Sequence, residues 1–87
     1  MPSADPPPPA RLVLYTRHDC GLCDEMMAGL APWLAERGLA AELRDVDADP
    51  VTRRRFGLKV PVLTVDGVLA CYGHLDLEAV ERLLGRP

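Results

Sequence analysis

Apolar and polar residues alternate along the chain with two different periods. The apolar run at residues 11–16 is typical of a buried strand. From Gly21 to about Arg37, apolar residues recur three and four positions apart, which predicts an amphipathic helix that ends at Gly38. Its apolar stripe consists of Leu22, Cys23, Met26, Met27, Leu30, Trp33 and Leu34. Pro32 lies inside this pattern, and we expect a single helix that bends there.

A second strand and a second helix are predicted in the middle of the chain. Apolar and polar residues alternate over residues 40–46, as expected of a strand with one buried face. Pro50 suits the first turn of a helix, and Gly57 suits its end. The first three elements therefore predict a strand–helix–strand unit with parallel strands.

The last third of the chain predicts a hairpin and a final helix. Residues 60–65 and 68–72 resemble strands, and Asp66–Gly67 between them is a strong turn signal. Asp76 is a suitable cap for a helix that Gly85 ends. The predicted order is β-α-β-α-β-β-α, an α/β class in which the hairpin runs antiparallel to the first strand or flanks it.

Composition narrows the domain organisation and the functional classes. The chain has 87 residues, which suits one small domain at 11–87, preceded by a Pro-rich segment at 1–10 that we expect to be disordered. The net charge of −3 argues against nucleic-acid binding, and Arg53–Arg55 are expected on a solvated helix face. No apolar run reaches the roughly 18 residues of a membrane span, and no secretory signal is present. We therefore expect a cytoplasmic protein without a membrane partner.

Two cysteines lie where the first strand meets the first helix. With Cys20 at the helix cap, Cys23 is its neighbour one turn on, with Cβ atoms about 5–6 Å apart, so a disulfide can form with little backbone movement. The helix start favours an anion, so we expect the pKa of Cys20 to fall below about 8.5. Cys23 lies on the apolar stripe and is expected to be buried. This asymmetry suits an exposed nucleophile and a shielded resolving thiol.

A proline is the second residue of the third predicted strand. From the residues alone, an ordinary trans Pro61 that opens the strand is favoured. The alternative is a cis Val60–Pro61 bond, because only X–Pro bonds adopt the cis form at low cost. A cis bond would turn the backbone of Val60 toward solvent, where it can pair with an extended substrate.

A metal site is the main rival to redox chemistry. Cys20, Cys23, Cys71 and His74 form a C-x2-C and C-x2-H pattern with ligand types that suit zinc. The interval between the two pairs is longer than in zinc modules, but the predicted fold brings the ends of the first and fourth strands to one side. A zinc or iron–sulfur site is therefore an alternative. Taken alone, Cys71 is expected to be a small buried residue and His74 a surface loop residue.

The motifs resemble those of the thioredoxin-like superfamily, and within it the small glutaredoxin-like proteins. The resemblance covers residues 11–84 and depends on "YTRHDCGLC", "RDVDADP" and "VPVL". It implies a glutaredoxin-type fold, with a four-stranded mixed sheet and helices on both faces. It also implies that Cys20 is the nucleophile, that Cys23 is the resolving thiol, and that Pro61 is cis beside them. The implied activity is thiol–disulfide oxidoreduction.

Some residues depart from the pattern of glutaredoxins that bind glutathione. Only Gly73 matches their usual Gly-Gly turn, while Arg17 can replace the basic residue before the motif. The resemblance implies no bound cofactor, with glutathione as a candidate co-substrate. The implied partners are a protein or small-molecule disulfide and an external reductant, either glutathione or a thioredoxin-reductase-type system. We expect a monomer. A non-catalytic adaptor with vestigial cysteines is a further alternative.

Overall fold

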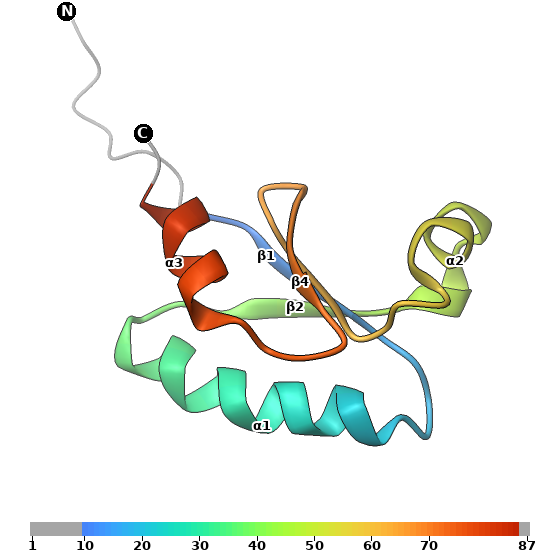
Figure 1. The fold of residues 1–87 in the computed structure, drawn as a ribbon, viewed down its shortest axis with the longest axis horizontal. Coiled ribbons are helices and arrows are strands. Elements are labelled where there is room, and N and C mark those ends of the chain that lie inside the picture. The colour runs from blue at the N-terminus through green and yellow to red at the C-terminus, as the bar shows by residue number, and fades with distance from the viewer. Residues whose placement is uncertain (1–9, 86–87) are drawn as a thin grey trace, which may run out of the picture.

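A four-stranded sheet with three α-helices makes up the computed structural model, which describes residues 10–85 (Figure 1). The elements are β1 Leu12–Thr16, α1 Gly21–Glu36, β2 Ala41–Asp45, the 3-10 helix η1 Val46–Ala48, α2 Pro50–Phe56, β3 Val62–Val65, β4 Val68–Tyr72 and α3 Leu77–Leu84. The predicted order of strands and α-helices is confirmed. Residues 1–9 of the expected Pro-rich segment lie outside the described residues.

The sheet is mixed, with the strand order β2-β1-β3-β4. β1 and β2 are parallel and pair Leu14 with Leu43. β3 runs antiparallel to both of its neighbours and pairs Leu63 with Leu14 on one side and with Cys71 on the other. These pairings confirm the parallel unit, the antiparallel hairpin and the thioredoxin-like, glutaredoxin-type fold class.

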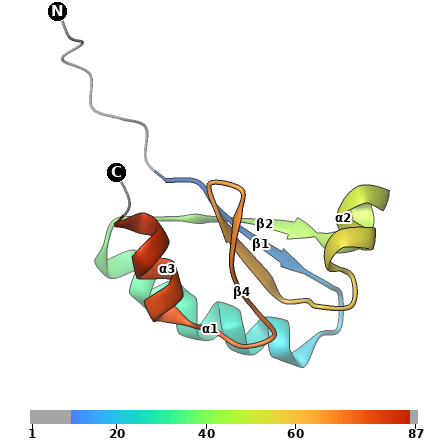
Figure 2. The same ribbon diagram turned by 45° about the horizontal axis from the view of Figure 1, so that its top comes forward.

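Alternating side chains of the strands pack against helices on both faces of the sheet. On one face, α1 and α3 cover Leu14 and Leu63 and form the larger core (Figure 2). On the other face, Phe56 of α2 packs against Tyr15, with ring centroids 5.0 Å apart, and against Val62. Successive residues of a strand point to opposite faces, which explains why Leu14 and Tyr15 enter different clusters.

The predicted helix with the internal proline is confirmed as α1. It continues through Pro32 to Glu36 and is followed by Gly38 with a φ of 65°. Near its C-terminal end, the guanidinium of Arg37 lies 4.0 Å from the centre of the Trp33 ring. Within residues 10–85, no helix combines the length and apolar character that crossing a membrane requires.

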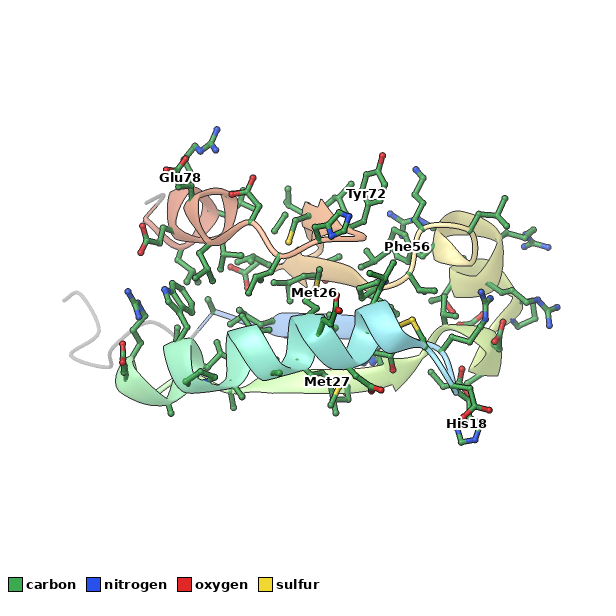
Figure 3. The ribbon with its side chains drawn as sticks, turned by 60° about the horizontal axis from the view of Figure 1, so that its bottom comes forward. His18, Met26, Met27, Phe56, Tyr72 and Glu78 are labelled. Carbon is green, nitrogen blue, oxygen red and sulfur yellow. A yellow bond between two sulfur atoms is a disulfide. The ribbon has the colours of Figure 1, made fainter. Side chains whose placement is uncertain are left out.

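The predicted apolar stripe of α1 is only partly buried. Cys23, Met26 and Leu30 are each 2% exposed, whereas Leu22 is 43% exposed. Leu22 lines a small hollow with Gly73, so this residue of the predicted stripe is exposed rather than buried. Met26 and Met27 leave the helix on opposite sides, and Met27 is only half-buried (Figure 3).

Two segments differ from the expected boundaries. β3 begins at Val62, two residues later than expected, and the Val60–Pro61 peptide bond before it is cis. The turn η1 after β2 was not expected; it forms where the Asp45 side chain accepts a hydrogen bond from the N–H of Asp47 at 2.9 Å. η1 buries Val46 completely and carries the chain toward α2.

Candidate functional site

The two cysteines of the CxxC motif form a disulfide at the N-terminal end of α1. Cys20 is the N-cap residue of the helix, and its Cα lies 5.2 Å from that of Cys23. The N–H of Cys23 points at the sulfur of Cys20 over 3.2 Å. Cys23 is 2% exposed, while Cys20 is half-buried. The predicted difference in burial is therefore present: Cys20 is partly exposed, whereas Cys23 is buried in the core.

The backbone before the helix explains how Cys20 reaches its capping position. Asp19 has a φ of 55°, a left-handed conformation that Asp tolerates better than most residues. This turn precedes the extended conformation of Cys20, with φ −114° and ψ 107°. Gly21, the residue after Cys20, has open space where a Cβ would stand. His18 projects away from the molecule (Figure 3).

The loop between α2 and β3 lies beside the N-terminal end of α1 (Figures 1 and 2). Its Pro61 is almost fully buried, and its carbonyl oxygen accepts a hydrogen bond from the N–H of Gly73 at 2.8 Å. Gly73 has a φ of 76°, which favours glycine, and it lines the same hollow of about 70 Å³ as Leu22. Pro61 and Gly73, predicted from motifs far apart in the sequence, are thus brought together by this hydrogen bond, and Gly73 shares a hollow with Leu22 of the CxxC motif.

Val60 lies in the loop before β3. No backbone hydrogen bond outside the helices and strands involves Val60 within residues 10–85. The residue is half-buried, and its side chain packs against the Phe56 cluster. Its N–H and C=O therefore lie at the edge of the loop without the pairing that an interior strand would give them.

Arg17 uses its guanidinium group in hydrogen bonds within the chain. Its Nε and Nη2 donate hydrogen bonds to the two carboxylate oxygens of Asp47, each at 2.9 Å, and its Nη1 donates to the carbonyl oxygen of Gly57 at 2.6 Å. The hydrogen bond with Arg17 lowers the pKa of Asp47, and the same contact raises the pKa of Arg17. These contacts join the turn before Cys20 to η1, which contains Asp47, and to the C-terminal end of α2, where Gly57 is the cap. We expected Arg17 to contact a substrate, but its N–H groups donate to Asp47 and Gly57 instead.

Asp47 and Gly57 were not identified from the sequence as partners of Arg17. A usable signal was present, because the carboxyl ends of parallel strands meet at one edge of a sheet. Arg17 follows β1 directly, Asp47 follows β2 by two residues, and the strands pair Thr16 with Asp45. The contact to Gly57 has no such signal, since it depends on the path of η1 and α2.

A pH-dependent loss of stability is expected in the Asp47→Asn variant. The folded-state pKa of Asp47 is lowered, so its carboxylate stabilises the fold above its unfolded pKa of about 3.9 and loses this effect as the pH falls through the folded pKa. The variant should be less stable than the parent at pH 7, and the difference should shrink below about pH 4. Urea unfolding at both pH values measures this.

The matched control is Glu36→Gln, which removes a carboxylate 3.7 Å from Arg37 at the exposed end of α1. Surface pairs of this kind contribute little, so we expect a smaller difference at pH 7. A gap between the Asp47→Asn variant and the parent that stays constant from pH 7 to pH 3 would contradict the assigned role of the charge.

The third cysteine belongs to the core. Cys71 is 9% exposed, lies opposite Leu63 in β4 and packs in the cluster that contains Met26 and Val80. Burial raises the pKa of its thiol, so it stays protonated at neutral pH. The interpretation of Cys71 as a small buried residue is confirmed.

The four-residue metal set predicted as an alternative is not brought together. Within residues 10–85, no three His, Cys, Asp or Glu side chains are grouped as metal ligands. β4 turns the Cys71 side chain into the core, whereas His74 is exposed at the hollow beside Leu22. The metal alternative for these residues is therefore not favoured, because Cys71 is buried in the core while His74, its partner in the C-x2-H half of the pattern, is exposed.

A family model and several solved structures match the chain. The model of the glutaredoxin-like domain (DUF836) matches residues 11–85. No curated protein matches the chain. The solution NMR structure of protein Ne2328 from Nitrosomonas europaea is 27% identical, with a TM-score of 0.80, over 95% of this chain and 100% of that one.

Two further structures extend the comparison. The X-ray structure of protein XcR50 from X. campestris is 29% identical, with a TM-score of 0.61, over 87% of this chain and 99% of that one. The thioredoxin of Fasciola hepatica is 13% identical, with a TM-score of 0.55, over 87% of this chain and 78% of that one. At this identity the thioredoxin supports a shared fold alone.

Proposed function

Because the chain belongs to the glutaredoxin-like domain family (DUF836), we propose that it is a thiol–disulfide oxidoreductase in which Cys20 attacks and Cys23 resolves. The observation that carries the proposal is the disulfide at the N-terminal end of α1, with the half-buried Cys20 at the cap and the buried Cys23 one turn later. Residues three apart at a helix start can open and close this bond without rearranging the core.

The proposed reaction has two steps. The Cys20 thiolate attacks one sulfur of a substrate disulfide, the substrate S–S bond breaks, and the departing thiolate takes a proton from water. The Cys23 thiol then loses its proton and attacks the Cys20 sulfur, which releases the second substrate thiol. The substrate gains two electrons and the cysteine pair loses two, ending as the Cys20–Cys23 disulfide. An external thiol reductant returns the pair to its dithiol form.

The helix end gives the two sulfurs these different roles. The Cys23 N–H directed at the Cys20 sulfur, together with the positive end of α1, favours the thiolate form of Cys20. The 2% exposure of Cys23 keeps its sulfur from meeting a substrate first. It can still reach Cys20 in the mixed disulfide, because the two Cα atoms are only 5.2 Å apart.

The loop of Val60 and Pro61 is the proposed docking edge for the substrate. The backbone N–H and C=O of Val60 can pair with an extended chain that adds to the loop as a short strand. Gly73 supports this loop through its hydrogen bond to the Pro61 carbonyl. A substrate disulfide held by such pairing would lie beside Cys20.

The source of electrons is part of the proposal. Glutathione or a thioredoxin-reductase-type system is the proposed reductant, in a cytoplasm where thiols are kept reduced. Arg17 already binds Asp47 and Gly57, so other cations would have to bind a glutathione carboxylate. The candidates are Arg53–Arg55 on α2, which are exposed. No bound cofactor is needed for the two steps above.

The Cys23→Ser variant tests the mechanism. It retains the first attack and lacks the second, so we expect stable mixed disulfides on Cys20 after incubation with oxidised glutathione or with a disulfide-containing protein. Mass spectrometry of the intact chain identifies the adduct and shows which substrate class is used. The Cys71→Ala variant is the control and should form no stable adduct, because its cysteine pair is intact. A folded Cys23→Ser protein that forms no adduct with either substrate would overturn the proposal and favour a non-catalytic adaptor.

A further inference from the structure

The β2 edge of the sheet lacks two of the devices that prevent strand addition, a proline and a break in the register. β2 and β4 are the outer strands in the order β2-β1-β3-β4, so each has one free side within residues 10–85. The β3–β4 pair contains a register shift at Leu63/Thr64, whereas β2 pairs with β1 in an unbroken register over all five residues. β2 contains no proline. A regular edge of this kind can serve as a template for another strand.

An apolar groove follows this edge on the side of α1. It has a volume of about 440 Å³, and its lining includes Leu43 of β2 with Met27, Ala28 and Ala31 of α1. Leu43 is 55% exposed even though it lies on the face of the sheet that bears the larger core. Within the described part of the chain, the groove is open along β2. An apolar strip next to free backbone groups is typical of a protein interface.

The sequence of β2 is complementary to itself in one orientation. β2 reads Ala41-Glu42-Leu43-Arg44-Asp45, with Leu43 at its centre. If a second copy approaches antiparallel with the two-fold axis at Leu43, Leu43 lies opposite its own copy and Glu42 lies opposite Arg44 of the second copy. The axis repeats this pair, so two Glu–Arg pairs flank a Leu–Leu pair. Opposite charges on facing strands stabilise such a pairing.

The charges are available for this pairing. In the single chain, Arg44 and Arg11 reach the Glu42 carboxylate at 3.1 Å and 3.2 Å. All three side chains are at least 42% exposed, so these are surface contacts that a second strand can share or replace. The pKa of Glu42 is lowered by its two arginines, so it is ionised at neutral pH.

We propose that β2 pairs with β2 of a second copy of this chain, forming a two-fold symmetric dimer with one continuous sheet. The Leu43 side chains and the two α1 grooves then cover each other on one face, and the Glu42–Arg44 pairs form on the other. This departs from the monomer expected from the sequence. The paired edge is short, so we expect a concentration-dependent monomer–dimer equilibrium.

The dimer leaves the cysteine pair accessible. The disulfide lies at the end of the molecule where β1 and β2 end, and antiparallel pairing puts the two sites at opposite ends of the joined sheet (Figure 1). Dimerisation and disulfide exchange are therefore independent, and the failure of one proposal does not affect the other.

Sedimentation equilibrium of the full chain tests the dimer. We expect the mass to rise from the monomer value of 9.5 kDa toward twice that value as the protein concentration increases. Glu42→Arg and Arg44→Glu should each raise the dimer Kd about tenfold, because the axis applies every charge reversal twice. The combined Glu42→Arg/Arg44→Glu variant reverses each pair and should restore the parent Kd to within about threefold.

A matched pair of lysine variants separates the two edges. Leu43→Lys should abolish the dimer, whereas Val68→Lys, at a residue of β4 that is 52% exposed, should leave it unchanged. Circular dichroism checks that each variant folds, and disulfide exchange at Cys20 should be the same in all of them. A parent chain that stays monomeric overturns the proposal. The proposal is equally overturned if the combined charge variant does not regain the parent Kd, or if Val68→Lys disrupts the dimer.

Discussion

The Cys20→Ser variant should lose disulfide exchange almost completely, with a rate at least about 10³-fold below that of the parent. A serine hydroxyl stays protonated at neutral pH and attacks a disulfide far more slowly than a thiolate does. The remaining thiols cannot replace Cys20, since Cys23 and Cys71 are 2% and 9% exposed. The measurement is the rate at which a small disulfide is reduced under a thiol reductant, with the uncatalysed rate subtracted.

The cysteine variants are interpreted as a set. Cys71→Ala removes the third thiol and should retain most of the activity, because Cys71 packs in the larger core cluster, which does not include the cysteine pair. Fluorescence or circular dichroism must show that all variants are folded at the assay temperature. If folded Cys20→Ser protein keeps more than about a tenth of the parent rate, another group is the nucleophile and the assignment of Cys20 is wrong.

The Leu63→Ala variant should be the most destabilised of the single variants considered, by about 2–5 kcal/mol. Leu63 is 0% exposed and stands between Leu14 and Cys71 in the middle of the sheet. Shortening it removes contacts with both neighbours and leaves a cavity under α1 and α3. Because small domains have only about 5–15 kcal/mol of stability, this loss is a large share of the total.

Urea unfolding of the Leu63→Ala variant and the parent measures this difference. The control is Leu69→Ala in β4, where the leucine is 43% exposed and much less packing is lost. We expect the control to cost less than about 1 kcal/mol. Equal effects of the two substitutions would contradict the central place of Leu63 in the core.

The fold was predictable from the sequence because its local signals agree with its long-range contacts. The three- and four-residue spacing of apolar positions predicted α1, and the Asp66–Gly67 pair predicted the β3–β4 hairpin. Asp76 was predicted to cap α3, and its side chain accepts a hydrogen bond from the N–H of Ala79. Each of these signals acts over a few residues and needs no knowledge of the rest of the chain.

The parts that were missed depend on contacts between distant residues. Leu22 has the spacing of a core residue, but only the path of the chain around Gly73 decides that it faces a hollow. Arg17 looks like a free cation in the sequence, and its partners Asp47 and Gly57 are 30 and 40 residues away. The residues alone favoured a trans Pro61, and the family resemblance was needed to expect the cis bond that the structure contains.

The position of the single tryptophan decides what optical methods can report about this protein. Trp33 follows Cys20 by roughly 13 residues along α1, which corresponds to about 20 Å of helix. It lies under Arg37 near the opposite end of the helix, 8% exposed, in the same cluster as Leu63. Its emission therefore follows the opening of the core and is a suitable signal for unfolding. At that separation it gives little direct information on whether the cysteine pair is oxidised or reduced, so the redox state must be followed by mass or by thiol labelling.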